Sequence, residues 1–204
     1  MYRPHAFALD DAGVLREVLR RRVFVTLATV KDGGILFAYA PVVAEEGGIR
    51  FHLAMRNPMA AMEDGTRVSL SCLAVDAYVS PDWYTSIVTV PTWNYIAVEG
   101  EGAVRRLSRE ELHKLLVDLS AHEEQKLAPK PPWTMDKVAP ERTEAMMNAI
   151  VGFSLTFERL EGKFKLSQDK PEQDMLGVID GLEARGDAVS LAVAGEMRKL
   201  KAGT

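Results

Sequence analysis

The stretch VFVTLATVKDGGILFAYAPVVAEEGGIRFHLA, residues 23–54, decides the fold. It holds three runs rich in apolar and β-branched residues: Val23–Val30, Ile35–Val43 and Ile49–Ala54. The two separators, Lys31–Gly34 and Glu45–Gly48, combine glycine with charged residues and are typical of turns between strands. The stretch therefore predicts a meander of three antiparallel strands.

Further strands and helices extend this meander. Three more strands are expected: Val68–Val75, Trp93–Leu107 and Gly152–Leu160. Cys72 lies on an apolar face of the first of these strands, which favours a buried, inert cysteine. Gly100 and Gly102 mark a bulge or a close approach in the second strand.

Helical patterns cover six segments: Asp10 or Asp11 to Arg22, Asn57–Gly65, Ser108–Gln125, one opened by Pro140, one opened near Pro171, and Asp187–Leu200. Ser108 and Glu111 form a capping box, and Asn57 suits the N-cap of its short helix. About six strands with peripheral helices predict a mainly β fold with α additions, an antiparallel barrel.

Composition narrows the class of protein. The chain has 204 residues, a formal net charge of −4 and a pI near 5.6, which argues against strong non-specific nucleic-acid binding but leaves a local basic patch open. Cys72 is the only cysteine, so neither an intrachain disulfide nor a cysteine zinc cluster can form. No apolar run reaches membrane-spanning length, and we expect a cytoplasmic protein without membrane contact.

The most aromatic stretch, Tyr78–Tyr95, reads YVSPDWYTSIVTVPTWNY. Its rings alternate with polar residues and with Pro81 and Pro91. Large flat rings with polar tips suit a surface that stacks a planar ligand or meets a partner. A proline-stiffened loop that plugs one end of a barrel explains the same pattern, and chemistry alone does not separate the two interpretations.

Two groups of cations are candidate anion sites. Arg56 precedes the helix expected after Asn57 and Pro58, where unpaired N–H groups beside an arginine suit a phosphate. An exposed arginine next to an ordinary cap is the alternative. Lys163 and Lys165 share one side of an extended segment, where they either meet an anion or protect an edge strand.

The remaining titratable residues do not form a recognisable catalytic site. His52 alternates with the polar positions of its strand and is a candidate ligand contact, whereas His113 and His122 read as solvated helix residues. The sequence contains no HExxH, G-x-S-x-G, P-loop or GxGxxG pattern, and its acidic residues show no spacing that singles out a catalytic pair. Arg20–Arg22 is more typical of a solvated helix end than of a DNA contact.

Several longer motifs together resemble one known family. They are Met1–Phe7 (MYRPHAF), Asn57-Pro58, Tyr78–Tyr84 (YVSPDWY), Val90–Tyr95 (VPTWNY), Gly152-Phe153, Arg159–Gln168 (RLEGKFKLSQ), Pro171-Glu172 and Asp174. In this order, and over nearly the whole chain to about residue 184, they are similar to the PaiB-like FMN-binding negative transcriptional regulators. The resemblance implies a split β-barrel of the flavin-reductase and pyridoxamine-phosphate-oxidase type. Such barrels are usually homodimers with flavin sites at the subunit interface.

The motifs and the resemblance together suggest a set of cofactor-binding residues: Arg56, Asn57, His52, Trp93, Asn94, Tyr95, Lys165 and Gln168. FMN is expected to stack near Trp93–Tyr95, and its phosphate is expected at Arg56 and the helix that begins at Pro58. At Thr85-Ser86-Ile87 the family commonly has Pro-Ser-Lys and a longer insert, so Ile87 stands in place of a cation.

The function implied by the resemblance is that of an FMN-binding negative regulator of transcription. The alternative is an FMN-dependent oxidoreductase of the flavin reductase or pyridoxamine oxidase type, in which the flavin carries the redox chemistry. Direct DNA binding without flavin is a third hypothesis, which the acidic pI opposes. We expect a single split-barrel domain with peripheral helices over residues 1–184 and a C-terminal helical tail over residues 185–204.

Overall fold

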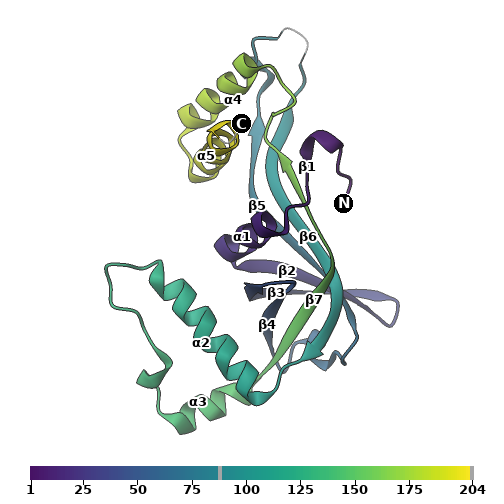
Figure 1. Cartoon of the computed structure of the whole chain (residues 1–204), viewed down its shortest axis with the longest axis vertical. Coiled ribbons are helices and arrows are strands. Elements are labelled where there is room, and N and C mark those ends of the chain that lie inside the picture. Colours follow the sequence, from purple (N-terminus) through teal and green to yellow (C-terminus); the bar gives the residue numbers. More distant parts are fainter. Residues whose placement is uncertain (87–88, 203–204) are drawn as a thin grey trace. The chain divides into compact units, whose positions relative to one another are not determined.

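The computed structural model describes residues 1–86 and 89–202 (Figure 1). Its strands are β1 (Ala8–Leu9), β2 (Phe24–Lys31), β3 (Gly34–Glu45), β4 (Gly48–Ala54), β5 (Arg67–Val79), β6 (Thr92–Arg106) and β7 (Ile150–Lys165). Its α-helices are α1 (Ala12–Arg22), α2 (Arg109–Gln125), α3 (Pro140–Met147), α4 (Glu172–Arg185) and α5 (Ala188–Ala202). Short 3-10 helices are η1 (His5–Phe7), η2 (Pro58–Ala61), η3 (Pro81–Trp83) and η4 (Met135–Lys137). Over the described ranges, no helix is long and apolar enough to cross a membrane.

The strands form one antiparallel sheet that closes on itself. Their order is β1-β7-β4-β3-β2-β5-β6, and β6 also pairs with β7. This additional pairing closes β2 to β7 into a barrel, while β1 pairs with β7 outside the ring. The mainly β barrel with helical additions that the sequence predicted is confirmed.

The β2–β3 hairpin shows how local sequence sets the register of the meander. Lys31 pairs with Gly34, which leaves Asp32 and Gly33 as a two-residue turn. Both turn residues have positive φ, 51° and 78°, as a type I′ hairpin requires, and Asp-Gly is a favoured sequence for it. The pairings of β3 with β2 and with β4 confirm the predicted meander.

Alternating residues of the strands fill the barrel core. Phe51 of β4 and Phe153 of β7 are fully buried partners, and their rings stack with centroids 5.5 Å apart. Cys72 of β5 is buried as well, and burial raises the pKa of its thiol to about 11. Such a thiol carries almost no thiolate at neutral pH, so the prediction of a buried, inert cysteine is confirmed.

Gly100 and Gly102 are close-approach positions, as predicted. A Cβ atom at Gly102 would lie 1.9 Å from the carbonyl oxygen of Thr156, and one at Gly100 would lie 2.6 Å from the ring of Phe157. Glycine therefore allows β6 to approach β7 closely at the pairing that closes the barrel.

The chain divides into two compact units. Unit 1 contains Met1–Asp11, Leu73–Val98 and Glu161–Thr204, and unit 2 contains Ala12–Cys72 and Glu99–Leu160. Strands β5, β6 and β7 contribute residues to both units. Within unit 1, α4 and α5 pack side by side (Figure 1), and within unit 2, α1 and α2 each pack on β3. The division into residues 1–184 and 185–204 stays a prediction.

The helix expected over Asn57–Gly65 is wrong in length and in type. Asn57 does cap η2, because its Oδ1 accepts a hydrogen bond from Met59 N at 2.9 Å, but η2 is a single 3-10 turn that ends at Ala61. Beyond this turn, the N–H of Gly65 donates to the carbonyl oxygen of Val104 in β6 at 2.8 Å. The segment after Ala61 bonds to the sheet instead of continuing as a helix, so tertiary contacts outweigh local helix propensity here.

The stretch Tyr78–Tyr95 is not a single loop, because both of its ends belong to strands. Strand β5 continues to Val79 and β6 begins at Thr92. Strand β7 likewise extends beyond the expected Gly152–Leu160. Strand β1 was not expected, since a strand of two residues has no detectable period.

Candidate functional site

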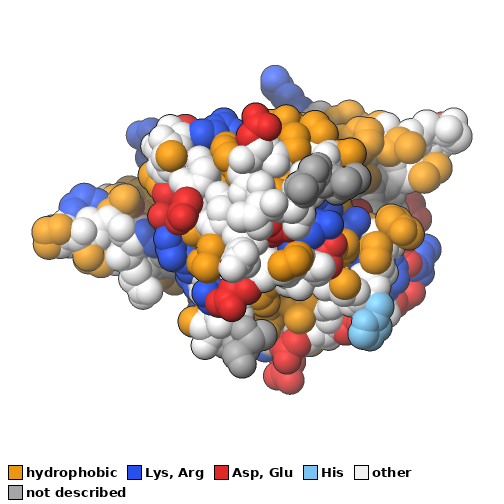
Figure 2. All heavy atoms as spheres, turned by 90° about the horizontal axis from the view of Figure 1, so that it is seen from above, with side chains coloured by type: hydrophobic (Ala, Val, Ile, Leu, Met, Phe, Trp, Pro, Cys, Tyr) orange, Lys and Arg blue, Asp and Glu red, His pale blue; other side chains and the backbone are white. Residues whose placement is uncertain are grey.

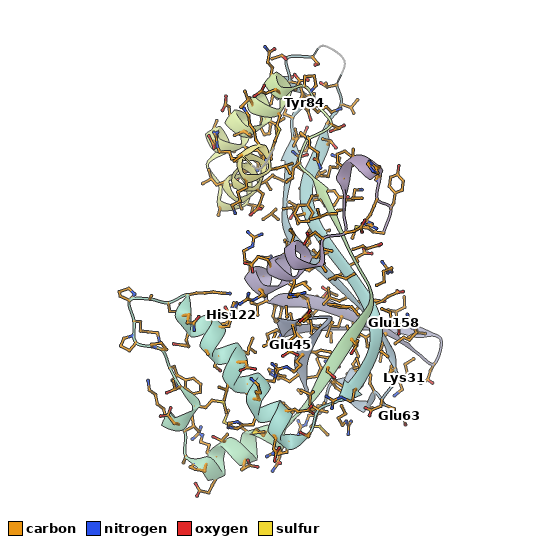
Figure 3. The ribbon with its side chains drawn as sticks, viewed as in Figure 1. Lys31, Glu45, Glu63, Tyr84, His122 and Glu158 are labelled. Carbon is orange, nitrogen blue, oxygen red and sulfur yellow. The ribbon has the colours of Figure 1, made fainter. Side chains whose placement is uncertain are left out.

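Unit 1 contains an open pocket beside the start of β6 and the end of β7. The lining residues that matter for its chemistry are Phe7, Tyr84, Thr92, Lys165, Ser167 and Lys170. Tyr84 is labelled in Figure 3, and the volume of the pocket is about 280 Å³. Two lysines and two aromatic rings around one cavity make this pocket the candidate site.

Lys165 is the central cation of the pocket. Its Nζ donates to Thr92 Oγ1 at 2.7 Å and to the carbonyl oxygen of Trp93 at 2.6 Å. Desolvation lowers the pKa of Lys165, and the positive charges of Lys163 and Lys170 lower it further against the opposing effect of Asp169. A bound anion would stabilise the charged form of such a lysine, so the pocket favours an anionic ligand.

Lys163 lies between two tyrosine rings. Its Nζ is 5.3 Å from the ring centroid of Tyr2 and 5.3 Å from that of Tyr95, and the residue is only 9% exposed. The two rings hold the ammonium group by cation–π attraction. A lysine that protects an edge strand is solvated, so the edge-strand interpretation of Lys163 is wrong.

Asn94 joins the start of β6 to the segment after β7. It is fully buried, and its Nδ2 donates to Ser167 Oγ at 2.9 Å, while Ser167 Oγ donates to Asn94 Oδ1 at 3.2 Å. Ser167 has a positive φ of 63°, a conformation that is uncommon for a residue with a side chain. The surrounding bonds maintain this backbone strain at the wall of the pocket.

Gln168 ties the N-terminal segment to the pocket. Its Nε2 donates to the carbonyl oxygens of Ala6 at 3.0 Å and Phe164 at 2.5 Å, and its Oε1 accepts from Leu166 N at 2.8 Å. Both amide hydrogens and the amide oxygen are therefore engaged by backbone groups. Gln168 therefore joins Ala6 to the segment after β7, while Asn94 reaches the wall of the pocket through Ser167.

The segment after η3 is fixed to α4 by Asp174. This buried carboxylate accepts hydrogen bonds from Thr85 N and Oγ1, both at 2.7 Å, and from Ser86 Oγ at 2.5 Å. The hydrogen bonds from Ser86, and then those from Thr85, lower the pKa of Asp174 to about 2. Ile87, which stands in place of the cation common in the family, lies outside the described residues.

The tryptophans of the aromatic stretch differ in their surroundings, and its role stays a prediction. Trp83 packs against α4, where a Cβ atom at Gly181 would lie 2.3 Å from its ring, so this tryptophan is a packing residue. Trp93, by contrast, is 52% exposed and meets Tyr78 edge to face at a centroid distance of 6.2 Å. Trp93 and Tyr78 therefore present open ring surface.

Arg56 and Asn57 lie in unit 2, in the turn between β4 and η2. The Arg56 side chain is exposed and forms no hydrogen bond or ion pair over residues 1–86 and 89–202. Asn57 uses its Oδ1 to cap Met59 N. Because η2 is one 3-10 turn, it contributes little of the dipole that a longer helix would offer to an anion.

The histidines differ from one another in their surroundings. His52 is half-buried on the β4 face that α2 covers, since Arg50 two residues earlier bonds to Asp118 of α2. Its Nδ1 is buried and has no hydrogen-bond partner among the residues that the structure describes, and desolvation lowers the pKa of His52. His113 is exposed as predicted, and His122 is partly exposed, with its Nε2 at 2.8 Å from the carbonyl oxygen of Arg20.

Residues 1–159 match the model of a family described as "Putative FMN-binding domain". The chain belongs to this family. A curated relative, the protease synthase and sporulation protein PAI 2 of Bacillus subtilis (strain 168), is 30% identical over 192 residues, which cover 90% of this chain and 89% of that protein. The resemblance to the PaiB-like FMN-binding family is thereby confirmed.

Two solved structures share the fold. The FAD and heme binding protein from Mycobacterium smegmatis has a TM-score of 0.59 at 15% identity and covers 83% of this chain and 78% of that chain. The flavocytochrome Anf3 from Azotobacter vinelandii has a TM-score of 0.58 at 16% identity and covers 86% of this chain and 78% of that chain. At these identities the likeness shows the fold alone, and it confirms the split β-barrel.

The lining of the unit 1 pocket suits the phosphate end of FMN, the cofactor in the family's description. Cationic donors stabilise a bound phosphate, and Lys165 and Lys170 supply them, while Phe7 and Tyr84 add aromatic surface. Small-molecule pockets typically measure about 300–1,000 Å³. A volume of about 280 Å³ therefore suits the phosphate and sugar-alcohol end of FMN rather than the whole molecule. Over the described ranges, no three His, Cys, Asp or Glu residues are grouped to hold a metal ion.

The structure brings together only part of the predicted site. Lys165 lines the unit 1 pocket, whereas Trp93, Asn94, Tyr95 and Gln168 belong to unit 1 but are not among the described lining residues. His52, Arg56 and Asn57 belong to unit 2. The sequence-based set also omitted pocket residues, namely Phe7, Tyr84, Thr92, Ser167 and Lys170. Several of these residues lie inside or next to the motifs that carried the resemblance. Their position in the sequence could therefore have indicated them as site residues.

Proposed function

We infer that this chain binds FMN and acts as a negative regulator of transcription. The observation that carries the flavin part is the partly desolvated Lys165 in a pocket that also holds Lys170. Asp169 also lines the pocket and lies 3.5 Å from Lys170 Nζ, so one carboxylate faces the two lysines and a net positive charge remains among the described pocket residues. A terminal phosphate matches that charge, and the family to which the chain belongs is described by FMN binding.

The roles of the residues follow from their contacts. Lys165 and Lys170 bind the phosphate, and the contacts of Lys165 with Thr92 and Trp93 orient its ammonium group. The exposed ring of Trp93 offers a stacking surface for the isoalloxazine, and buried Asn94 holds the strand beneath it. FMN supplies electron-transfer chemistry when bound, and we assign no acid or base to this chain.

Arg56 is the other candidate phosphate ligand. It is exposed in unit 2 and forms no ion pair among the described residues, so its guanidinium is available to an anion. Asn57 fixes the turn that carries it. The two phosphate assignments, Lys165 with Lys170 or Arg56 with Asn57, compete, and matched variants decide between them.

The test is a visible absorbance spectrum of the purified full chain, followed by FMN titration. Lys170→Ala is compared with Lys199→Ala, because Lys199 is an exposed lysine of α5 outside the pocket. We expect the Lys170 variant to bind FMN about tenfold more weakly and the Lys199 variant to bind normally. A tenfold loss confined to Arg56→Ala would transfer the phosphate to the unit 2 turn, and a chain that binds no FMN would overturn the proposal.

The regulatory part of the proposal rests on similarity to PaiB-like proteins. Regulation can act through direct DNA binding or through a protein partner, and the test below distinguishes the two. The net charge of −4 does not favour direct DNA binding. On the face drawn in Figure 2, basic and acidic side chains are interspersed with hydrophobic ones. The test is a mobility-shift assay with promoter DNA and random DNA at low salt, in the presence and absence of FMN. Promoter binding that requires FMN would assign direct regulation. If deleting the gene relieves repression in cells but the protein does not shift the promoter DNA, regulation would be assigned to a protein partner.

A homodimer is part of the proposal, and an exposed sheet face of unit 2 supports it. On β2 and β3 the side chains of Phe24, Phe37 and Tyr39 lie on one face and are 58%, 61% and 69% exposed. Adjacent large apolar side chains of this kind mark an interaction surface. A second copy of the chain would cover them.

A further inference from the structure

A second cleft lies in unit 2, between α1 and α2 and over the end of β3. Its volume is about 390 Å³, and Val43 and Leu119 form part of its apolar lining. Glu45 at the end of β3 and His122 of α2, both labelled in Figure 3, also line it. This volume lies within the range of about 300–1,000 Å³ that is typical of small-molecule sites. None of the proposed flavin ligands lines this cleft.

Two carboxylates of the cleft are already neutralised by protein cations. Arg50, which is 8% exposed, donates from Nε to Glu45 Oε1 and from Nη2 to Asp118 Oδ2, each at 2.7 Å. Lys114 Nζ donates to Asp118 as well, at 2.8 Å. Desolvation tends to raise the pKa of Asp118, but the hydrogen bonds from Arg50 and Lys114 outweigh it, and the pKa is lowered. Asp118 is therefore ionised and compensated.

The wall formed by α1 carries the positive charge that remains. Arg16 and Arg20 are one turn apart, so their side chains leave the same face of the helix, and both line the cleft. Arg20 lies 3.7 Å from Glu17, a distance that indicates a weak surface pair. Arg16 forms no ion pair within the part of the chain that the structure describes. Glu46, an exposed carboxylate that also lines the cleft, opposes these arginines.

His122 fixes the spacing of the two helices at this cleft. Its Nε2 lies 2.8 Å from the carbonyl oxygen of Arg20. A carbonyl only accepts hydrogen bonds, so we assign the hydrogen to Nε2, and Nδ1 is the remaining polar atom of the ring. The bond joins α2 to the last turn of α1.

We propose that this cleft binds a small organic oxyanion, a carboxylate or a phosphate, on Arg16 and Arg20. A guanidinium donates paired N–H groups to either anion, which makes arginine the side chain suited to this recognition. Val43 and Leu119 receive the short apolar body of the ligand. The site is separate from the proposed flavin pocket, since no residue lines both cavities.

The test is isothermal titration calorimetry of the full chain with succinate and, separately, with inorganic phosphate. We expect saturable binding of at least one probe, and a loss of about tenfold or more in affinity for Arg16→Ala. Arg21→Ala is the matched control, because Arg21 lies on the same helix but does not line the cleft. Saturation by succinate alone would assign a carboxylate, and saturation by both probes would assign the shared oxyanion chemistry.

Two further variants separate a specific site from general charge effects. Glu46→Gln should tighten binding, because it removes the carboxylate that opposes the arginines. If Arg16→Ala does not fold, Arg16→Lys keeps the charge, loses the paired donors and should still bind more weakly. The proposal would be overturned if neither succinate nor phosphate bound saturably. It would also be overturned if Arg16→Ala and Arg21→Ala lost equal affinity. FMN titration of Arg16→Ala should match that of the unaltered chain, so failure of the flavin proposal is recognised separately.

Discussion

Ser86 donates its hydroxyl hydrogen to Asp174 at 2.5 Å across 88 residues of sequence, and the same carboxylate accepts three further bonds from the Thr85-Ser86 segment. We expect Asp174→Asn to lower the thermal unfolding midpoint, because an amide nitrogen in place of Oδ2 cannot accept the bond from Ser86 Oγ. Differential scanning calorimetry measures the effect. Asp180→Asn, at an exposed position of the same helix, should leave the midpoint unchanged, and equal shifts in the two variants would contradict the assigned role.

Acid should weaken this attachment in a defined range. The pKa of Asp174 is about 2 in the folded chain, against an ordinary value near 3.9. The unfolded chain therefore takes up the proton first, so the contribution of Asp174 is complete above pH 4 and declines as the pH falls toward 2. Urea unfolding of the unaltered chain and Asp174→Asn at several pH values should show two curves that converge in acid.

Gly181 provides the space in which Trp83 packs. A Cβ atom there would lie 2.3 Å from the indole ring, so Gly181→Ala should lower the free energy of unfolding by roughly 1–3 kcal/mol. Gly195→Ala is the matched control in α5, since its Cβ atom would meet nothing within 4 Å. Better helix propensity should stabilise that variant by about 0.5–1 kcal/mol. Effects of the same sign in the two alanine variants would contradict the packing argument.

His52 should make the stability of the chain depend on pH near neutrality. Desolvation lowers the pKa of His52 from the ordinary value of 6.5. Just below pH 6.5, His52 is therefore protonated more fully in the unfolded chain than in the folded chain. Stability should therefore fall as the pH drops below 6.5, until the folded pKa is reached. His52→Phe should flatten this part of the profile, measured by chemical unfolding between pH 5 and 8. His113→Phe, at an exposed position, should not flatten it.

Phe37→Glu should dissociate the proposed dimer. The side chain is 61% exposed on the β2–β3 face, so a carboxylate is tolerated in a monomer but not between two apolar faces. Light scattering during size-exclusion chromatography should give the mass of two chains for the unaltered protein and of one for the variant. A monomeric unaltered chain would remove the dimer from the proposal.

Most of the secondary structure was predictable because its signals are local. The Asp32-Gly33 turn and the Ser108–Glu111 capping box each lie within a few residues of sequence, and both are present. The length of η2 was not predictable, because the bond from Gly65 to Val104 joins positions far apart in the chain. Local sequence propensity contains no information about a hydrogen-bond partner so distant in the chain.

The candidate site was only partly predictable for the same reason. Lys165 was found from its charge and its alternation, and the pocket does contain it. Phe7 and Lys170 carry no special spacing relative to it, and only folding places them in one cavity. Gln168 was found by resemblance, but its contacts with Ala6, Phe164 and Leu166 could be seen only in the folded chain.

The composition of unit 1 from three separate segments has a consequence for synthesis on the ribosome. Ala8 of β1 pairs with Lys163 of β7, so β1 is translated long before the strand with which it pairs. Unit 2, by contrast, has all of its residues once Leu160 has emerged. Contacts between such distant positions form slowly, because a long loop must close first. The pocket of unit 1 is therefore expected to form last, after the hairpins of the meander at residues 23–54 have formed.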